Sequence, residues 1–409
     1  MLGKWFPLLS LNFFGILNDS FLKKLFAFVS IYWIAGKEND GDLMNFYLGL
    51  SGFLFVLPYI VFSPFAGKLS RQYLKRKIVI WAKIAEFPVA VIGGMGFLMN
   101  SVYLVLLTIF LMGIISCLFS PAKYGLIRDI GGKEGISFGS GAFEMVAFLG
   151  NLSGAVLAGI VADVSGHQDY FIIGLVILIA FNGWYSAINI KAVESETEKN
   201  NESTLKSFVG SIKWSKNIPG LLNVILCLGL FWLSVSMVDM VIAVHGPNVL
   251  NISKTETGYI IAGVAVCVAA GSLAAGLLSG KKVRLSLVPI GAIGFSIPFT
   301  MIYFLNPAVE LFTLLLLIAA FFAGIYMVPL NAFIQDRVEG RKLGDILAFN
   351  NFSIFSFVLT SAVIFMVIEN SVMVFLAIAA VSWIMIALSI ILHPGIIKLF
   401  IKLFRKRKA

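Results

Sequence analysis

Charged and amide side chains interrupt several long apolar segments of the chain, where either a membrane or a protein core would surround them. Those in the N-terminal half include Asn18, Asp19, Lys83, Glu86 and Glu144. An ionised side chain near the middle of a bilayer costs about 3 kcal/mol on insertion scales, so such residues usually serve a function. A buried ammonium group can hold a phosphate, and a buried carboxylate can hold an amine or a proton. These residues are therefore the first candidates for a binding site.

Some of these charges have a partner of opposite sign on their own helix face. Asp19 and Lys23 are four residues apart. Lys83 and Glu86 are three apart, and both spacings allow an ion pair on a helix. Each pair has two interpretations, a structural salt bridge or a polar wall that faces a cavity. Lys24 adds a second positive charge near Asp19, which favours the cavity for the first pair. For Lys83 and Glu86 we favour a structural or gating pair.

Glu144 has no basic residue on its own helix face, which Phe148 and Asn151 extend. A carboxyl group in that situation must be protonated, paired with a group on another helix, or hydrated. Glu144 is therefore the leading candidate for a functional carboxylate.

Two pairs of similar stretches indicate an internal duplication. PAKYGLIRD from Pro121 to Asp129 is echoed by PLNAFIQD from Pro329 to Asp336, 208 residues later. AGKLS from Ala66 to Ser70 is echoed by AGLLS from Ala275 to Ser279, 209 residues later. Two matches at nearly one offset predict two related halves.

By this repeat, a group of amides near the cytoplasmic ends of two later segments is related to Lys123, Tyr124 and Glu144. The amides are Asn331, Gln335, Asn350 and Asn351. We expect one polar cluster of cations, amides and carboxylates in the cytoplasmic half of the interface between the repeats. Because the surrounding segments are mainly apolar, this cluster suits an amphiphile better than a sugar.

The composition predicts a membrane protein. Apolar residues make up 59% of the chain and charged residues 13%, with a mean hydropathy of +0.95, whereas soluble domains are about a quarter charged. The net charge of +10 comes from basic residues in short breaks between apolar segments, which is typical of membrane loops rather than of a nucleic-acid site. Cys117, Cys227 and Cys267 lie in apolar segments without metal-site spacing.

Twelve segments are long and apolar enough to cross a membrane as helices, which requires about 20 residues each. They are 5–35, 45–69, 78–99, 101–121, 136–162, 170–190, 219–243, 256–279, 285–305, 308–333, 346–368 and 371–393. Basic residues crowd the loops on one side, while the opposite loops carry only Lys37 and Lys254, so both termini are expected in the cytoplasm. The first segment is too long for a signal peptide and should be retained.

We expect an all-α membrane protein of two pseudo-symmetric six-helix bundles, 1–190 and 219–393. A polar cytoplasmic linker, 191–218, would join them, and 394–409 would form a basic cytoplasmic tail. This organisation resembles the major facilitator architecture, in which the substrate site lies between the halves near the membrane midplane.

Several motifs resemble those of the bacterial lysophospholipid transporter family. They are the Asn18-Asp19 pair, the KxxE spacing of Lys83 and Glu86, PAKYGLIRD, and VPLNAFIQDR followed by ILAFNNF. The chain looks most similar to the transporter portion of fusions with acyltransferase and acyl-carrier-protein synthetase domains, over essentially its whole length.

The resemblance implies a flippase that moves lysophosphatidylethanolamine and lysophosphatidylglycerol from the outer to the inner leaflet of the bacterial inner membrane by alternating access. A separate cytoplasmic acyltransferase would then reacylate them. The expected substrate-binding set is Asn18, Asp19, Lys123, Tyr124, Glu144, Asn331, Gln335 and Asn351. We expect a monomer in contact with membrane lipid, with no metal or organic cofactor, in which H⁺ or Na⁺ could couple transport.

The loop after the second segment departs from the facilitator pattern. It reads GKLSRQYLKRK, with Arg71 where an aspartate is usual and Leu74 where a glycine is usual. This puts the usual charge relay of that loop in doubt, and Lys83 with Glu86 is a hypothetical replacement.

Other functions stay open. A proton-coupled drug exporter of the same fold is the main alternative, because GNLSGAVLAG from Gly150 to Gly159 partly follows the antiporter pattern, with Ala155 in place of its proline. A non-transporting receptor is a second. An enzyme is not expected, since the three histidines lack the HxxxxD spacing of an acyltransferase and no phosphate-binding loop is present.

Overall fold

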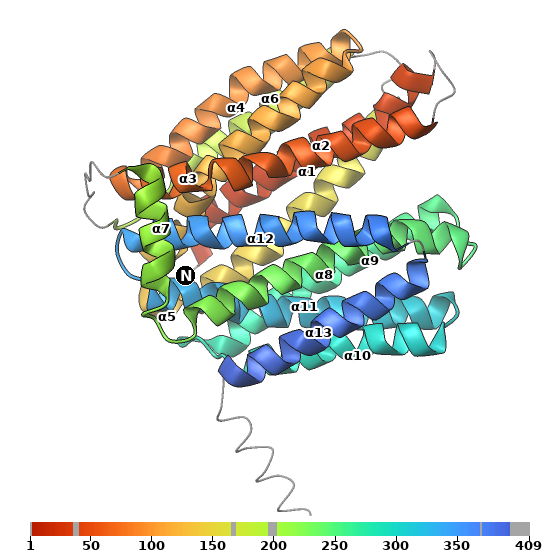
Figure 1. Ribbon diagram of the computed structural model, residues 1–409. Helices are drawn as coiled ribbons and strands as arrows, with labels where there is room; N and C mark the ends of the chain where they lie inside the picture. The colour runs from red at the N-terminus through yellow and green to blue at the C-terminus, as the bar shows by residue number, and fades with distance from the viewer. Residues whose placement is uncertain (1, 36–40, 165–168, 195–202, 369, 393–409) are drawn as a thin grey trace, which may run out of the picture. The chain divides into compact units, whose positions relative to one another are not determined.

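The computed structural model describes residues 2–35, 41–164, 169–194, 203–368 and 370–392, and within these ranges the regular structure is helical throughout. After a short 3-10 helix at Leu2–Lys4, the first helices are α1 Phe6–Ala35, α2 Gly41–Val61, α3 Ser63–Gln72, α4 Lys75–Leu98, α5 Val102–Val164 and α6 Asp169–Ile188. The others are α7 Thr204–Ser215, α8 Leu221–Asn248, α9 Lys254–Ser279, α10 Leu287–Leu305, α11 Val309–Arg337, α12 Lys342–Val367 and α13 Ser371–Leu392 (Figure 1).

Each of the twelve predicted spans lies on a helix, but two of the helical connections differ from a simple loop. The second span consists of α2 and α3, which are bent by 52° relative to each other. Pro64 lies in the first turn of α3, where its missing N–H favours a new helix start rather than a continued helix. The fourth and fifth spans are the two arms of α5, which is interrupted at Gly132 with a φ of 61°, a value readily available to glycine.

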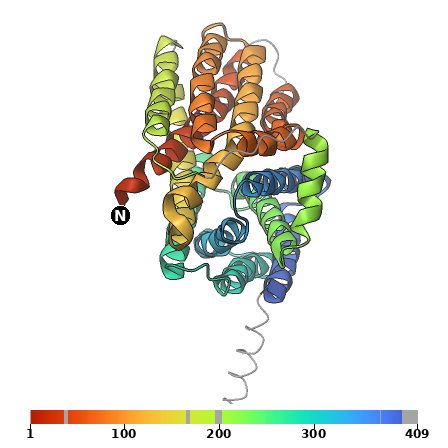
Figure 2. The same ribbon diagram turned by 90° about the vertical axis from the view of Figure 1, so that its left-hand side faces the viewer.

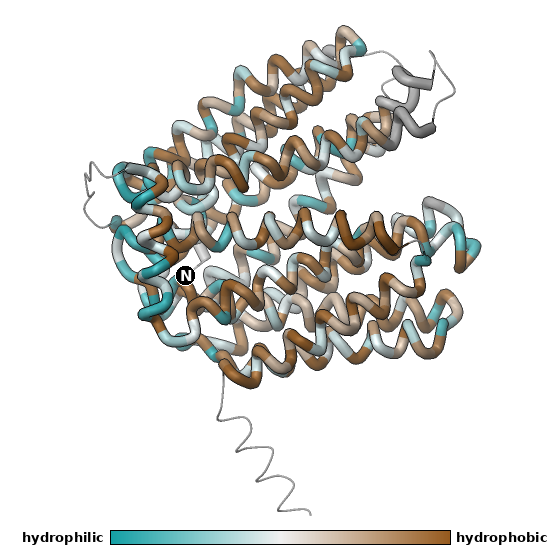
Figure 3. Tube along the Cα trace, viewed as in Figure 1, coloured by the Kyte–Doolittle hydropathy of each residue, from teal (hydrophilic) through white to brown (hydrophobic). Residues whose placement is uncertain are grey.

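The described helices support a membrane protein. Nine of them are long and apolar enough to cross a membrane, or ten if the bent pair counts as one span. α5 enters that count once, and α1, which Asn18, Asp19 and Lys23 interrupt, does not enter it. Figure 3 shows apolar residues along the helices and hydrophilic residues gathered mainly near their ends. An all-helical, multi-pass membrane protein is therefore confirmed, and the number twelve stays a prediction.

The chain divides into two compact units. Unit 1 comprises Met1–Gly132, Val146–Ile212 and Val338–Phe352, and unit 2 comprises Lys133–Met145, Lys213–Arg337 and Ser353–Ala409. In unit 1, α6 packs against α1 and α4, around a core that includes Phe21, Phe26 and Phe97. In unit 2, α11 packs against α9 and α10, and α13 packs against α8 and α10. Figures 1 and 2 show the helices within each unit running side by side.

Each unit includes a short segment from the other half of the sequence. Residues 133–145 belong to unit 2, and residues 338–352 belong to unit 1. The 208-residue repeat carries 133–145 onto 341–353, so the two exchanged segments are nearly equivalent parts of the two repeats. These units have bounds of their own, and the division into bundles at 1–190 and 219–393 stays a prediction.

The predicted linker contains a helix that was not expected from the sequence. α7 lies within 191–218, and its Phe208 is buried, with ring centroids 6.3 Å from Phe349 and 5.9 Å from Phe352. This part of the linker is therefore packed into unit 1 rather than solvated on all sides. Residues 195–202 of the linker and the predicted basic tail lie outside the described residues.

Candidate functional site

The centre of α1 contributes a carboxylate to a polar cluster inside unit 1. Asp19 is half-buried and accepts a hydrogen bond from Ser116 Oγ of α5 at 3.0 Å. Three lysines, Lys23, Lys83 and Lys123, are close enough to act on this carboxylate electrostatically. The cluster thus gathers groups from α1, α4 and the first arm of α5.

Lys83 and Glu86 form an ion pair in the same region. Lys83 Nζ lies 2.5 Å from Glu86 Oε1, and both side chains are buried. Two glycines make room for the lysine between helices, because a Cβ at Gly15 of α1 or Gly183 of α6 would lie 3.0 Å or 3.5 Å from its Nζ. A larger residue at Gly15 would therefore push the ammonium group away from α1.

Lys123 lies beside the same pair across an aromatic ring. Its Nζ is 5.1 Å from the centroid of Phe119, and Lys83 Nζ is 5.4 Å from that centroid. The Tyr124 ring centroid is also near, 5.7 Å from Lys123 Nζ. These separations allow cation–π attraction, which strengthens when the cation is desolvated. The ring of Phe119 therefore helps to place two ammonium groups.

Two amides border the cluster. Asn351 of α12 donates to Ser120 Oγ of α5 at 2.8 Å, and its own exposed fraction is 9%. Asn18 is buried, and its Oδ1 has no hydrogen-bond partner among the described residues. A buried carbonyl oxygen without a partner is costly unless a ligand or water satisfies it.

The charges of this cluster do not balance formally. Three lysines (Lys23, Lys83 and Lys123) accompany two carboxylates (Asp19 and Glu86). A net cationic cluster within membrane-spanning helices is complementary to an anion, and it also offers a carboxylate to a cation. The arrangement suits a zwitterionic or anionic headgroup better than a neutral solute.

A second polar group lies inside unit 2. Glu144 is buried and accepts a hydrogen bond from Asn331 Nδ2 at 3.0 Å. Ser140 lies four residues before Glu144 in α5, and Gln335 lies four residues after Asn331 in α11. Gln335 Nε2 donates to Ser140 Oγ at 3.3 Å. Two hydrogen bonds therefore join the second arm of α5 to α11, and Glu144 is satisfied by an amide from another helix.

A glycine lets this arm of α5 approach its neighbour in unit 2. A Cβ at Gly141 would lie 2.6 Å from the carbonyl oxygen of Ser272 and 2.9 Å from the Cα of Gly276, both on α9. Real Cβ atoms do not approach backbone so closely, so a larger residue would force the two helices apart.

The structure places the predicted site residues in two groups. Unit 1 holds Asn18, Asp19, Lys83, Glu86, Lys123, Tyr124 and Asn351, and unit 2 holds Glu144, Asn331 and Gln335. That both groups line one hollow stays a prediction. Ser116, Phe119 and Ser120 were not predicted, although they lie seven, four and three residues before Lys123 and therefore near its face of the helix.

An ion pair joins α3 to the start of α12 within unit 1. Arg71 Nη1 lies 3.2 Å from Asp345 Oδ2, with both side chains buried, and it also donates to Ser207 Oγ of α7 at 2.6 Å. Arg71 stands where an aspartate is usual in this loop, and its carboxylate partner comes from α12. The loop whose charge relay was in doubt therefore does form an ion pair, in which Arg71 of α3 supplies the cation.

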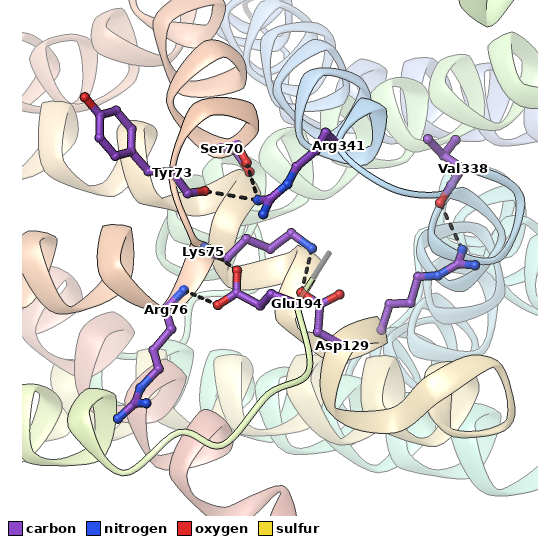
Figure 4. A network of polar contacts seen from close by, with 9 residues as sticks. Ser70, Tyr73, Lys75, Arg76, Asp129, Glu194, Val338 and Arg341 are labelled. Carbon is purple, nitrogen blue, oxygen red and sulfur yellow. Dashed lines mark hydrogen bonds and ion pairs between the residues drawn. The ribbon is translucent and has the colours of Figure 1, made fainter. Parts of the chain in front are cut away.

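Further contacts extend this network from the end of α3 and the start of α4 to the break in α5. Arg341 donates to the carbonyl oxygens of Ser70 and Tyr73, at 3.4 Å and 3.1 Å (Figure 4). Lys75 Nζ pairs with Asp129 at 2.6 Å. These bonds fasten residues 338–352 and the neighbouring loops to the helices of unit 1.

Two more side chains complete the network. The Glu194 carboxylate accepts hydrogen bonds from the backbone N–H groups of Lys75 and Arg76, as Figure 4 shows. Arg128 donates to the carbonyl oxygen of Val338 at 2.9 Å and pairs with Glu339 at 2.8 Å.

Within the described ranges, the side chains of His, Cys, Asp and Glu form no group of three or more that could hold a metal ion.

The sequence matches a known family over most of its length. Residues 13–362 match the model of the Major Facilitator Superfamily. The chain is 26% identical over 293 residues to the lysophospholipid transporter LplT of Photorhabdus laumondii, covering 71% of this chain and 70% of that protein. It is 26% identical over 288 residues to LplT of Yersinia pestis strain Pestoides F, covering 69% and 68%. The resemblance inferred from the motifs is confirmed.

Solved structures share the fold. The crystal structure of the human organic anion transporter MFSD10 superposes with a TM-score of 0.75 at 12% identity, covering 94% of this chain and 99% of that chain. The transporter FucP in its outward conformation gives a TM-score of 0.73 at 14% identity, covering 94% and 97%. At these identities the likeness concerns the fold alone.

Proposed function

The chain belongs to the Major Facilitator Superfamily, and on that premise we propose that it carries lysophospholipids across the bacterial inner membrane. It is a transporter rather than an enzyme, as its family and its named relatives are. The substrate class is supported by the relatives called LplT, at 26% identity. The proposed direction is from the outer to the inner leaflet, with both termini in the cytoplasm and a separate acyltransferase acting on the product.

The observation that carries this proposal is the meeting of Asp19, Lys83 and Lys123 in unit 1. A lysophospholipid has a phosphate, which ammonium groups bind through charge-assisted hydrogen bonds. The ammonium group of an ethanolamine headgroup would in turn pair with the Asp19 carboxylate. The Oδ1 atom of Asn18, which has no hydrogen-bond partner within the described ranges, is a further acceptor for a headgroup N–H or O–H.

We propose that Glu144 and Asn331 form a second polar contact for the headgroup during alternating access. Transport would then require the two halves of the chain to move around a site near the membrane midplane. In an ion-coupled cycle, Asp19 or Glu144 would be the carboxylate that takes H⁺ or Na⁺.

Reconstitution into proteoliposomes tests the headgroup assignment. Movement of fluorescent lysophosphatidylethanolamine and lysophosphatidylglycerol would be followed for the wild type, Asp19→Asn and Lys123→Gln. A hydrogen bond to a charged group contributes about 1.5–3 kcal/mol, so Lys123→Gln should slow both lipids by about 10- to 100-fold. Asp19→Asn should slow the ethanolamine lipid more than the glycerol lipid, because only the former carries a cation.

Lys282→Gln supplies the matched control, since this lysine is exposed in the loop between α9 and α10. It should transport both lipids at the wild-type rate. Wild-type rates for Asp19→Asn and Lys123→Gln would contradict the site. Movement of a lipophilic cation without any movement of lysolipid would favour an exporter instead.

A further inference from the structure

An apolar groove lies on unit 1 where α3, α4 and α5 meet. Its volume is about 190 Å³, which is small beside the pockets that hold drug-sized molecules, about 300–1,000 Å³. The residues that shape it include Ile78, Trp81, Ala82, Ala85, Leu118 and Phe119. Ala82 and Ala85 are the small side chains of α4 that leave the space open. The groove therefore has room for a segment of one hydrocarbon chain.

Aromatic residues mark the mouth of the groove as lying at a membrane interface. Trp81 is 48% exposed and Tyr73 is 42% exposed, and their rings meet edge to face with centroids 5.4 Å apart. Exposed Trp and Tyr are enriched at the headgroup level of membranes. Trp81 lies six residues from the start of α4, about 9 Å along the axis at 1.5 Å per residue. From there the groove continues to Ala85, toward the hydrocarbon region.

A cation stands beside this mouth. Lys77 is exposed and precedes Trp81 by four residues on α4, so the two side chains are neighbours on the helix surface. No ion pair or hydrogen bond engages the Lys77 ammonium group in the part of the chain that is described. The adjacent Arg76 is engaged, because its guanidinium donates to the carbonyl oxygen of Ile188 at 2.7 Å. Lys77 is thus the cation available to an anionic headgroup.

We propose that this groove binds an anionic phospholipid of the surrounding leaflet, with one acyl chain between α3, α4 and α5 and the phosphate at Lys77. The charge of Lys77, the aromatic pair and the apolar walls follow one another in the order phosphate, glycerol and acyl chain. In this proposal the lipid is distinct from a transported lysolipid, because the buried ring of Phe119 lines the groove and its centroid also lies 5.4 Å and 5.1 Å from the Nζ atoms of Lys83 and Lys123. A bound chain would therefore also support the ring that places them.

Lipid retention by the purified full-length protein tests the proposal. Native mass spectrometry in detergent, with equal amounts of phosphatidylglycerol and phosphatidylcholine added, would measure which lipid stays bound. A lysine near an anionic lipid is worth about 1 kcal/mol, so the wild type should prefer phosphatidylglycerol about fivefold. Lys77→Gln should remove that preference, whereas Lys282→Gln, an exposed lysine elsewhere, should keep it. The double variant Ala82→Leu/Ala85→Leu should lose retention of both lipids.

A second measurement does not depend on the Ala82 and Ala85 substitutions. Phosphatidylglycerol with brominated acyl chains should quench the Trp81 fluorescence of the wild type, obtained as the difference from Trp81→Phe, more strongly than brominated phosphatidylcholine does. Equal quenching by the two brominated lipids would overturn the proposal. So would a wild type that retains the two lipids equally, or a Lys77→Gln variant with the same preference as the wild type. Displacement of phosphatidylglycerol by stoichiometric lysophosphatidylethanolamine would also overturn it, because the groove would then belong to the transported lipid.

Discussion

Replacing Asp345 with alanine should destabilise unit 1 strongly, because it leaves a buried guanidinium group without its carboxylate. The Arg71 and Asp345 side chains are 8% and 5% exposed, and their charged atoms lie 3.2 Å apart. Nε and Nη2 of Arg71 are buried without a hydrogen-bond partner among the described residues. Only the hydroxyl of Ser207, at 2.6 Å from Nη1, would remain as compensation in the described part of the chain.

The size of the effect follows from the burial of the pair. Removing one partner of a buried ion pair costs about 3–5 kcal/mol, and the remaining bond to Ser207 favours the lower end. For a folding unit of 150–250 residues, each kcal/mol lowers Tm by about 2–4 °C, so Asp345→Ala should lower Tm by about 6–12 °C. The double variant Arg71→Met/Asp345→Leu should lower it far less, because no buried charge is left alone.

Buried cysteines provide the assay. Cys117 is buried in unit 1, while Cys227 and Cys267 belong to unit 2. With Cys227 and Cys267 replaced by serine, the reaction of Cys117 with a thiol-reactive dye during heating reports the unfolding of unit 1. The serine-substituted parent protein is the reference for each variant.

An exposed ion pair serves as the control for the buried one. Lys281 and Glu134 are paired at 3.0 Å, but their side chains are 80% and 71% exposed, so Glu134→Ala should change Tm very little. A shift below about 2 °C for Asp345→Ala would be less than 1 kcal/mol and would refute the reasoning. Equal losses in Asp345→Ala and in the double variant would refute it as well.

The buried polar groups give two shorter predictions. Glu144→Ala should abolish lysolipid transport without loss of membrane insertion. Glu144→Gln should keep the hydrogen bond from Asn331, so it separates the role of the charge from that of the contact. Wild-type transport by the alanine variant in vesicles would remove Glu144 from the site. Exchanging the charges of Lys83 and Glu86 should preserve transport if the pair is structural, and loss of transport at normal abundance would indicate that the pair touches substrate.

Contacts within one helix were accessible from the sequence, and contacts between distant segments were not. Lys83 and Glu86 share a face by their spacing alone, and the structure pairs them at 2.5 Å. Arg71 and Asp345 are 274 positions apart, so neither local pattern nor charge could join them. The departure of Arg71 from the facilitator pattern put the charge relay of that loop in doubt. It could not identify the carboxylate partner, because Asp345 lies on another helix.

Glu144 and α7 show the same limit in different ways. The sequence established that Glu144 lacks a basic neighbour on its own face, and it left three states open for the carboxyl group. The structure supplies an amide partner, Asn331, 187 positions away. In the linker, the polar residues before α7 led to the prediction of a segment without a helix. Phe208 of α7 packs against two rings of α12, and this tertiary contact stabilises the helix despite its polar surroundings in the sequence.

The repeated AGxLS stretches acquire a physical explanation from their glycines. A Cβ at Gly67 would lie 3.1 Å from the Cβ of Ala348 and 3.2 Å from the Cα of Asp345, both in unit 1. A Cβ at Gly276 would lie 3.0 Å from the carbonyl oxygen of Ser137, in unit 2. Each glycine thus lets its helix approach one of the exchanged segments, 338–352 or 133–145.

This equivalence predicts matched effects of substituting the two glycines. Gly67→Ala should destabilise unit 1 and Gly276→Ala unit 2, each by about 1–3 kcal/mol, because a methyl group is added to a filled contact. Unfolding of the two units would be followed through Cys117 and Cys227 respectively. Gly174→Ala in α6 is the control, since no atom of the described residues lies within 4 Å of its added Cβ, and alanine should there raise stability by up to about 1 kcal/mol. If both substitutions behaved like Gly174→Ala, close packing could not be the reason that the glycine recurs in both repeats.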